Sequence, residues 1–195
     1  MRPVLSLLAA ALLGGALPSS HALAQATAAV VEPAAPAVGE LAPAFTAQAA
    51  GASGAAAAPV SLAALRGKVV VLAFYPADRT GGCTAQLTKF RDEYRALFGA
   101  GAGDDVVVLP ISADDLASHA LWAKEMAFPF ALVSDPQLAV AERYGARRAN
   151  GAHASRVLYV IDRQGGVAYR DLRFNALGEG AYAAMADAVA RARKG

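Results

Sequence analysis

The single cysteine of the chain, Cys83, is the residue whose type and position could do chemistry. It follows Gly81 and Gly82, where an apolar run ends in a loop and an amphipathic segment begins. A thiol in the first turn of a helix meets unsatisfied N–H groups and partial positive charge, which favour its nucleophilic thiolate form. The glycines let a substrate approach the backbone closely. Position alone leaves an alternative open, in which Cys83 is a small buried hydrophobic residue in register with Leu87 and Phe90.

The cysteine count narrows the chemistry further. One thiol cannot form an internal disulfide, although exported domains usually use their cysteines in pairs. Thiol–disulfide oxidoreductases of the thioredoxin fold normally carry Cys-x-x-Cys, and the residue three places after Cys83 is Gln86. His21, His119 and His153 lack the spacing of metal ligands. We therefore interpret His119 and His153 as surface residues, and the sequence predicts neither a metal nor a cofactor.

Three apolar, β-branched runs predict the strands that must position the cysteine. Residues 68–74 (KVVVLAF) and 105–111 (DVVVLPI) have the continuous apolar character of strands buried on both faces, and Pro110 is expected to end the second ladder. Residues 156–161 (RVLYVI) form a third such run, which a short turn separates from a pairing partner at 167–171. Cys83 thus lies just beyond the end of a central strand, where ligand sites of open α/β sheets gather.

Apolar residues at helical spacing predict helices between these strands. The first begins near Cys83 and ends at the glycines of 99–103, and the second contains Trp122 as a packing residue. A short third helix is expected from Asp135 as N-cap to a stop at Gly145. The last helix is marked by Tyr182, Met185 and Val189. Alternating strands and helices predict an α/β fold with a central mixed β-sheet flanked by helices on both faces.

The N-terminal region has the pattern of an export signal. Residues 1–24 combine a positive start, a short apolar run and a small-x-small cleavage site. The apolar run is too short to span a bilayer. Residues 25–38 are rich in Ala and Pro and indicate a linker, so residues 39–195 are expected to form the one folded domain. We expect export, most simply to a bacterial periplasm. The formal net charge of +2 does not point to nucleic acid or to a membrane surface.

The spacing Pro76-x-x-x-Thr80-x-x-Cys83 resembles the active-site motif of the peroxiredoxins, the AhpC/TSA superfamily. The wider string FYPADRTGGCTAQ at 74–86 is similar to the bacterioferritin-comigratory, PrxQ-like branch. Later segments follow the order of that branch: ISADDLASHALW, FPFALVSD and RVLYVID. The resemblance covers the chain from about Gly39 to the C-terminus and implies a thioredoxin-like fold.

The resemblance also implies an activity and its residues. Cys83 would attack hydrogen peroxide or an organic hydroperoxide and become a sulfenic acid. Thr80 would hold peroxide and thiolate in line, and Pro76 would shield the sulfur from bulk water. Arg156 would place a permanent cation beside the sulfur, stabilising the thiolate and the charge on the departing oxygen. Gln86 occupies a Glu/Gln position of the family and is expected to support them.

Two residues depart from the family pattern. Gly81 stands where a proline is usual, and Thr88 stands where many relatives carry a second, resolving cysteine. The sulfenic acid must therefore be reduced by an external thiol, from a thioredoxin-like protein, a glutaredoxin or a small thiol, or must pair with Cys83 of another molecule. We expect a monomer or a homodimer. Two alternatives stay open: a thiol–disulfide oxidoreductase of the thioredoxin fold, and an inactive thioredoxin-like binding module.

Overall fold

The computed structural model describes residues 35–56, 58–100, 102–149 and 151–195. The predicted signal at 1–24 and most of the predicted linker at 25–38 lie outside these residues. The strands are β1 Thr46–Ala50, β2 Ala58–Ser61, β3 Val69–Phe74, β4 Val106–Ser112, β5 Leu132–Ser134, β6 Val157–Ile161 and β7 Val167–Asp171. The helices are α1 Gly81–Asp92, α2 Tyr94–Phe98, α3 Leu116–Met126, α4 Ala139–Arg143 and α5 Glu179–Ala192, with 3-10 turns at Ala52–Gly54 and Leu62–Leu65. In this part of the chain no helix is long and apolar enough to cross a membrane.

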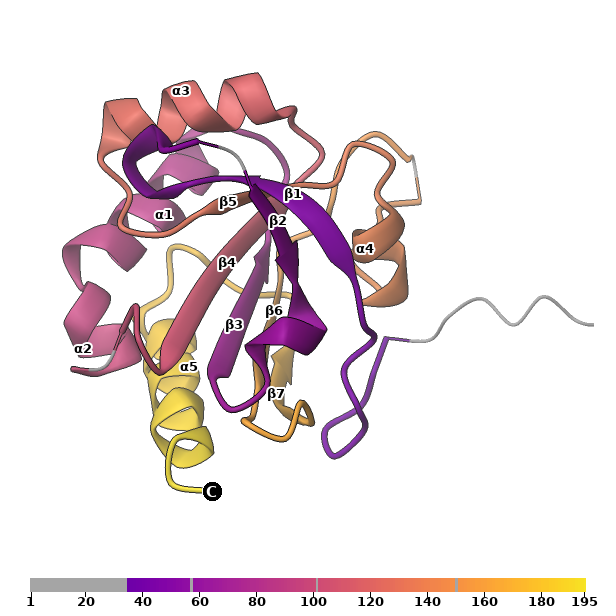
Figure 1. The fold of residues 1–195 in the computed structure, drawn as a ribbon, viewed down its shortest axis with the longest axis vertical. Helices are drawn as coiled ribbons and strands as arrows, with labels where there is room; N and C mark the ends of the chain where they lie inside the picture. The colour runs from indigo at the N-terminus through magenta and orange to yellow at the C-terminus, as the bar shows by residue number, and fades with distance from the viewer. Residues whose placement is uncertain (1–34, 57, 101, 150) are drawn as a thin grey trace, which may run out of the picture. The chain divides into compact units, whose positions relative to one another are not determined.

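The strands form one mixed sheet in the order β2-β1-β5-β4-β3-β6-β7 (Figure 1). β3 lies in its interior, pairs parallel with β4 and antiparallel with β6, and has every residue buried. A strand with neighbours on both edges and helices on both faces must be apolar throughout, which is why its sequence does not alternate. The hairpin predicted at the C-terminal edge is confirmed as β6 and β7, with an irregularity between Val160 and Ile161.

Pro110 does not end the β4 ladder, so that expectation was wrong. The register with β3 continues through Ala73↔Pro110 and Phe74↔Ile111. Because the carbonyl of Ile111 accepts from Tyr75 N on the β3 side, the backbone nitrogen of the preceding Pro110 faces the opposite side. On that opposite side the neighbouring strand is β5, which pairs with β4 only from Ile111 onward. The missing N–H therefore removes no bond to β3.

Helices cover both faces of the sheet, as predicted (Figure 1). One core contains the apolar faces of α1, α2, α3 and α5 together with the β3 side chains of Val69, Val71 and Ala73. The other contains the buried residues of α4 together with Val70 and Leu72. The alternation of β3 side chains between the two cores is the period-2 geometry of a strand.

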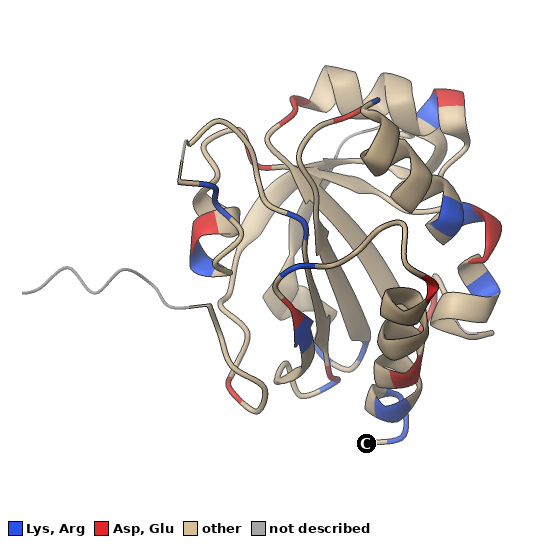
Figure 2. Cartoon of the chain, turned by 180° about the vertical axis from the view of Figure 1, so that it is seen from behind, with Lys and Arg blue, Asp and Glu red and all other residues tan. Residues whose placement is uncertain are grey.

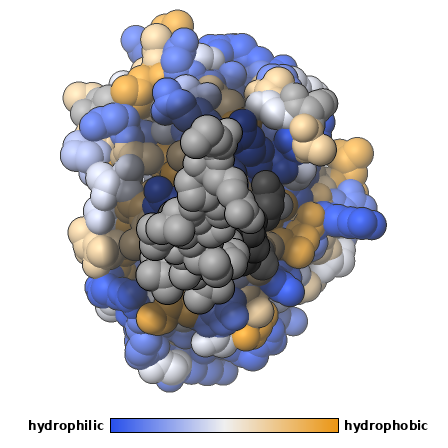
Figure 3. Space-filling model, turned by 90° about the vertical axis from the view of Figure 1, so that its right-hand side faces the viewer, coloured by the Kyte–Doolittle hydropathy of each residue, from blue (hydrophilic) through white to orange (hydrophobic). Residues whose placement is uncertain are grey.

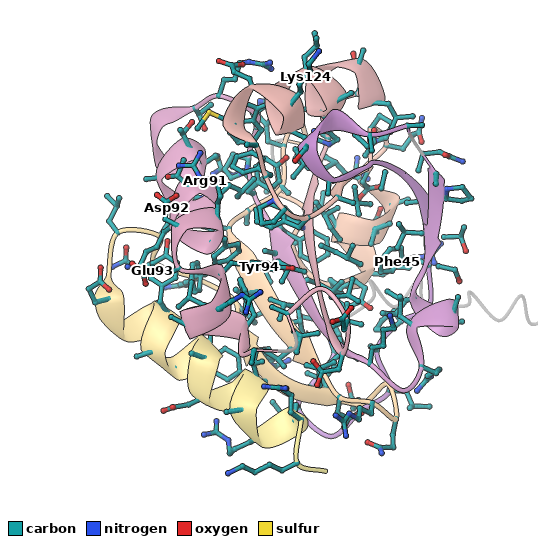
Figure 4. All side chains as sticks on the ribbon, turned by 60° about the vertical axis from the view of Figure 1, so that its left-hand side comes forward. Phe45, Arg91, Asp92, Glu93, Tyr94 and Lys124 are labelled. Atoms are coloured by element: carbon teal, nitrogen blue, oxygen red, sulfur yellow. The ribbon has the colours of Figure 1, made fainter. Side chains whose placement is uncertain are left out.

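The first predicted helix is two helices, α1 and α2. Glu93 between them has φ −106° and ψ 24°, outside the helical region. The apolar face nevertheless continues across the break, since Tyr94 contacts the rings of Phe98 and Phe130. In Figure 4 Tyr94 lies on the side of these helices that faces the sheet. Gly99, with φ +85°, follows α2 as the sequence predicted.

The predicted start of the third helix was also wrong. α4 begins after Leu138, not at Asp135. The Asp135 side chain still satisfies the helix end from outside, since it accepts hydrogen bonds from the backbone N–H of Val140 (3.0 Å) and Ala141 (2.8 Å). Burial raises the pKa of Asp135 in spite of these bonds.

Charged residues of both signs share the side of the molecule seen in Figure 2. Figure 2 shows Lys and Arg interspersed with Asp and Glu along the helices and loops. On the face seen in Figure 3, hydrophobic side chains are scattered among hydrophilic ones.

Candidate active site

Cys83 lies in the first turn of α1, directly after β3 and the residues 75–80, here called the 75–80 loop. Thr80 is the N-cap residue, with φ −76° and ψ 148°, and its carbonyl accepts from the N–H of Thr84 at 2.8 Å. Cys83 is therefore the third helical residue, within reach of the positive end of the helix. Its side chain is fully buried. The position agrees with the sequence-based expectation, and the burial shows that Cys83 also belongs to the core.

A permanent cation lies beside the sulfur. Arg156 Nη2 is 3.5 Å from Cys83 Sγ, and Arg156 Nη1 donates a hydrogen bond to Gln86 Oε1. Sheet register explains this proximity of residues far apart in sequence. β6 runs antiparallel to β3 with Phe74 opposite Val157, so the residue before β6 lies beside the chain that leaves β3. Gln86, buried one turn after Cys83 on α1, holds the guanidinium through its second terminal nitrogen, Nη1.

Pro76 and Thr80 lie in the 75–80 loop that leads into α1. The Thr80 hydroxyl donates to the carbonyl of Ala77 at 3.1 Å, closing a tight turn just before the helix. Thr80 is exposed and Pro76 is half-buried. Arg156 thus contacts Cys83 directly. Pro76 and Thr80 are connected to Cys83 only along the chain, through the 75–80 loop and the first turn of α1.

Two glycines, Gly81 and Gly82, directly precede the cysteine. A Cβ atom at Gly81 would meet no atom within 4 Å, and one at Gly82 would meet only Arg156 Nη2, at 3.2 Å. A side chain at Gly82 would therefore displace the guanidinium. Neither position carries a side chain that would cover the backbone beside the Cys83–Arg156 pair.

Gly81→Pro is expected to stabilise the protein by about 0.4–1 kcal/mol without loss of function. Gly81 is the first helical residue, where proline is favoured, and Thr80 already has the extended conformation that precedes proline. The measurement is the free energy of unfolding in urea. The contrasting variant, Gly82→Ala, should cost reactivity of Cys83 through Arg156. An unfolding free energy for Gly81→Pro below that of the wild type would contradict this account of the helix start.

The sequence-based interpretation of His119 as a surface residue was wrong. His119 is fully buried, while His153 is exposed as expected. His119 Nδ1 lies 3.0 Å from the Asp78 carboxylate, in the 75–80 loop, and His119 Nε2 lies 3.2 Å from the carbonyl of Val133. The available signal was helical position: His119 adjoins Trp122 and Ala123 on the buried face of α3.

Comparisons with known proteins agree with this architecture. Residues 38–170 match the AhpC/TSA family. The chain is similar to "Peroxiredoxin Q, chloroplastic" of Triticum aestivum, with 45% identity over 56% of this chain and 49% of that protein. The protein of the same name from Sedum lineare is 43% identical over 55% of this chain and 56% of that protein. The chain thus spans about half the length of the curated relatives it matches.

Solved structures extend the similarity over most of the chain. Peroxidoxin BcpB from Mycobacterium tuberculosis has 28% identity and a TM-score of 0.64, covering 82% of this chain and 97% of that one. The reduced 2-Cys peroxiredoxin of Plasmodium vivax has 25% identity and a TM-score of 0.67, covering 81% and 99%. The fold is therefore thioredoxin-like, as the sequence predicted. The family match over residues 38–170 shows that the chain belongs to the AhpC/TSA family, and the relatives and solved structures named here are similar to it within that family.

Proposed function

We propose that this protein is a thiol-dependent peroxidase that reduces hydrogen peroxide and organic hydroperoxides through Cys83. The observation that carries the proposal is the contact between Arg156 Nη2 and Cys83 Sγ, 3.5 Å apart, at the N-terminus of α1. Packing a thiol into the core does not require a guanidinium beside it, and partly removing that charge from water costs free energy. Membership of the AhpC/TSA family supports the same chemistry.

The reaction has two half-steps, of which the first uses the residues around Cys83. The Cys83 thiolate attacks one peroxide oxygen, the O–O bond breaks, and the other oxygen leaves with a proton as water or an alcohol. Cys83 is thereby oxidised to the sulfenic acid. Arg156 stabilises the thiolate beforehand and the charge on the departing oxygen during the step. We assign Thr80 to align the peroxide and Pro76 to keep water from the sulfur.

The second half-step needs a thiol from outside the chain. Thr88 occupies the place of a resolving cysteine, and Cys83 is the only cysteine. An external thiol condenses with the sulfenic acid to a mixed disulfide and water, and a second thiol then releases the Cys83 thiol. Because Cys83 is fully buried, a protein reductant requires the first turn of α1 to open.

Mass spectrometry tests the proposal directly. One equivalent of hydrogen peroxide should add one oxygen to Cys83, trapped by a sulfenic acid reagent, and a small thiol should reverse it. Steady consumption of peroxide should then require both the protein and a thiol. Exchange of disulfides without peroxide consumption would instead favour an oxidoreductase. Binding without either activity would favour an inactive thioredoxin-like module.

We also propose that the protein is exported and acts in a bacterial periplasm. The support is the sequence pattern of residues 1–24. Expression of the full chain in a Gram-negative host should yield periplasmic protein whose N-terminus follows Ala24. Recovery of the uncleaved chain from the cytoplasm would contradict this proposal and leave the peroxidase untouched.

A further inference from the structure

Gln86 carries a buried hydrogen-bond donor that no group in the described part of the chain satisfies. Gln86 Oε1 accepts from Arg156 Nη1, but Gln86 Nε2 has no hydrogen-bond partner among residues 35–56, 58–100, 102–149 and 151–195. A guanidinium can only donate, so the atom that faces Arg156 is the oxygen, and the unsatisfied atom is the nitrogen. The Gln86 side chain is fully buried. A donor that is kept from water without an acceptor costs free energy, so its presence needs an explanation.

The contacts of Gln86 with its neighbours do not explain this nitrogen. The hydrogen bond to Arg156 uses only Oε1, which a glutamate would supply equally well without an unsatisfied N–H. Packing does not explain it either, since Leu87 and Phe90 on the same helix fill the core with apolar side chains. A use for Nε2 must therefore come from an acceptor that arises during the reaction.

The Gln86 side chain lies over the turn of α1 that holds the reactive sulfur. Gln86 follows Cys83 by three residues, and residues three apart are neighbours on one helix face. A long side chain in a helix leans back toward the N-terminus, here over Cys83 and Gly82. The contacts of Arg156 agree with this direction. One end of its planar fork, Nη1, bonds Gln86 Oε1, and the other end, Nη2, lies 3.5 Å from Cys83 Sγ.

The reduced sulfur does not satisfy Nε2, but an oxidised sulfur brings the missing acceptor. In the reduced protein Cys83 Sγ contacts Arg156, and no hydrogen bond joins it to Gln86 Nε2. Attack on peroxide bonds one oxygen to Sγ, and this oxygen has lone pairs that accept hydrogen bonds. The reaction thus places an acceptor in the same turn of the helix as the unsatisfied donor.

We propose that Gln86 Nε2 donates a hydrogen bond to the oxygen that peroxide leaves on Cys83, and that it stabilises this oxygen as it departs under attack by an external thiol. The proposal rests on the proposed peroxidase, because peroxide is the source of the oxygen. In this step the thiolate of the external thiol forms an S–S bond to Cys83, the S–O bond breaks, and its electron pair leaves with the oxygen as hydroxide. The hydroxide takes up the proton that the thiol lost and becomes water. The Cys83 sulfur is reduced from sulfenic acid to disulfide, and the incoming sulfur is oxidised.

Arg156 and Gln86 then act on different departing oxygens. Arg156 stabilises the oxygen that leaves peroxide in the first half-step, and Gln86 stabilises the oxygen that leaves Cys83 in the second. In both half-steps negative charge develops on an oxygen inside a buried site, where a preorganised donor has a large effect. Gln86 is accordingly a catalytic residue of the second half-step, in addition to holding the guanidinium.

Two substitutions of Gln86 remove the donor in different ways. Gln86→Glu keeps the size of the side chain and an oxygen for Arg156 Nη1, but it has no N–H and adds a negative charge. Gln86→Met keeps the length of the side chain, has no N–H and adds no charge. Gln137→Glu is the matched control, because Gln137 is exposed on the segment before α4 and the substitution is chemically the same.

The first readout is the rate at which dithiothreitol removes the sulfenic acid. The full chain is oxidised with one equivalent of hydrogen peroxide, dithiothreitol is added, and the remaining sulfenic acid is trapped and counted by mass spectrometry. We expect both Gln86 variants to be slower by about 10²-fold, the lower end of the usual loss when one donor to a developing charge is removed. Gln137→Glu should keep the wild-type rate. Because methionine adds no charge, slowing in Gln86→Met cannot come from repulsion of the incoming thiolate, and a wild-type rate in Gln86→Met would overturn the proposal.

The second readout uses the wild-type protein and needs no variant to react. The two protons on Gln86 Nε2 give nuclear magnetic resonance signals in ¹⁵N-labelled protein, which are assigned by their absence in Gln86→Glu. When Cys83 is oxidised to the sulfenic acid, one of these signals should move downfield, and the Gln137 side-chain amide should not move. An oxidised Cys83 with an unmoved Gln86 amide would overturn this proposal and leave the peroxidase standing. A Cys83 that gains no oxygen from peroxide would instead refute the proposed function, and the role of Gln86 with it.

Discussion

Replacing Cys83 by serine is expected to abolish peroxide consumption, whatever thiol is supplied. The hydroxyl of serine is far more weakly acidic than a thiol, so the helix end and Arg156 cannot make it a nucleophile at neutral pH. No other thiol can take over, because the chain has one cysteine. The measurement is the loss of peroxide over time in the presence of a small thiol, first with the full-length wild type and then with the full-length Cys83→Ser variant.

The folding of the Cys83→Ser variant must be shown separately. Cys83 is fully buried in the core that α1 and α5 share, and serine is smaller and more polar. Its thermal midpoint and its circular dichroism are the controls. Thr84→Ser, which alters the neighbouring residue on α1 and leaves the sulfur in place, should keep the wild-type rate. A folded Cys83→Ser protein with wild-type turnover would remove the peroxidase proposal.

The sequence predicted the part of the fold that depends on local pattern. Residues 69–74 are apolar without alternation, and that pattern alone placed them inside the sheet, where β3 lies. Tyr182, Met185 and Val189 recur at helical spacing and all face the core from α5. The position of Cys83 in the first turn of a helix followed from the same patterns, because the glycines and the strand before it fix where the helix can start.

What the sequence could not predict depends on partners far along the chain. Pro110 was expected to end the ladder because proline has no N–H to donate. The register with β3 decides which neighbouring strand its nitrogen faces, and the local sequence does not contain that register. His119 looked like a surface residue because its partners, Asp78 and Val133, lie on other elements. Asp135 looked like an N-cap because its type fits one, although its carboxylate reaches the helix end from outside.

Register also explains how Arg156, which the resemblance to peroxiredoxins singled out, comes to lie beside Cys83. The motif around Cys83 is local, but the arginine is 73 residues away and is brought in only by the antiparallel pairing of β3 with β6. Buried contacts between the two strands fix this pairing, since a slip by one residue would turn every β6 side chain to the wrong face. The contact between the guanidinium and the sulfur thus depends on the pairing of the sheet.

Replacing Arg156 by methionine is expected to slow the reaction of Cys83 with peroxide by about 10²–10³-fold, the usual loss when one preorganised donor to a developing charge is removed. Methionine keeps much of the side-chain volume, but Gln86 Oε1 loses its donor, which costs about 1–3 kcal/mol of stability. The double variant Arg156→Met, Gln86→Leu removes both partners and should recover that stability without recovering the rate. Arg143→Met, which removes a guanidinium from α4, is the matched control and should leave the rate unchanged.

A second reagent distinguishes the two effects assigned to Arg156. Alkylation of Cys83 by iodoacetamide needs the thiolate but releases iodide, which the guanidinium was not placed to stabilise. If Arg156 both favours the thiolate and stabilises the oxygen that leaves peroxide, its loss should slow the peroxide reaction more than the alkylation. Equal slowing of both reactions would limit Arg156 to ionising the thiol. An undiminished peroxide rate in Arg156→Met would show that the contact with Cys83 Sγ has no part in the reaction, and the case for a peroxidase would lose its principal structural support.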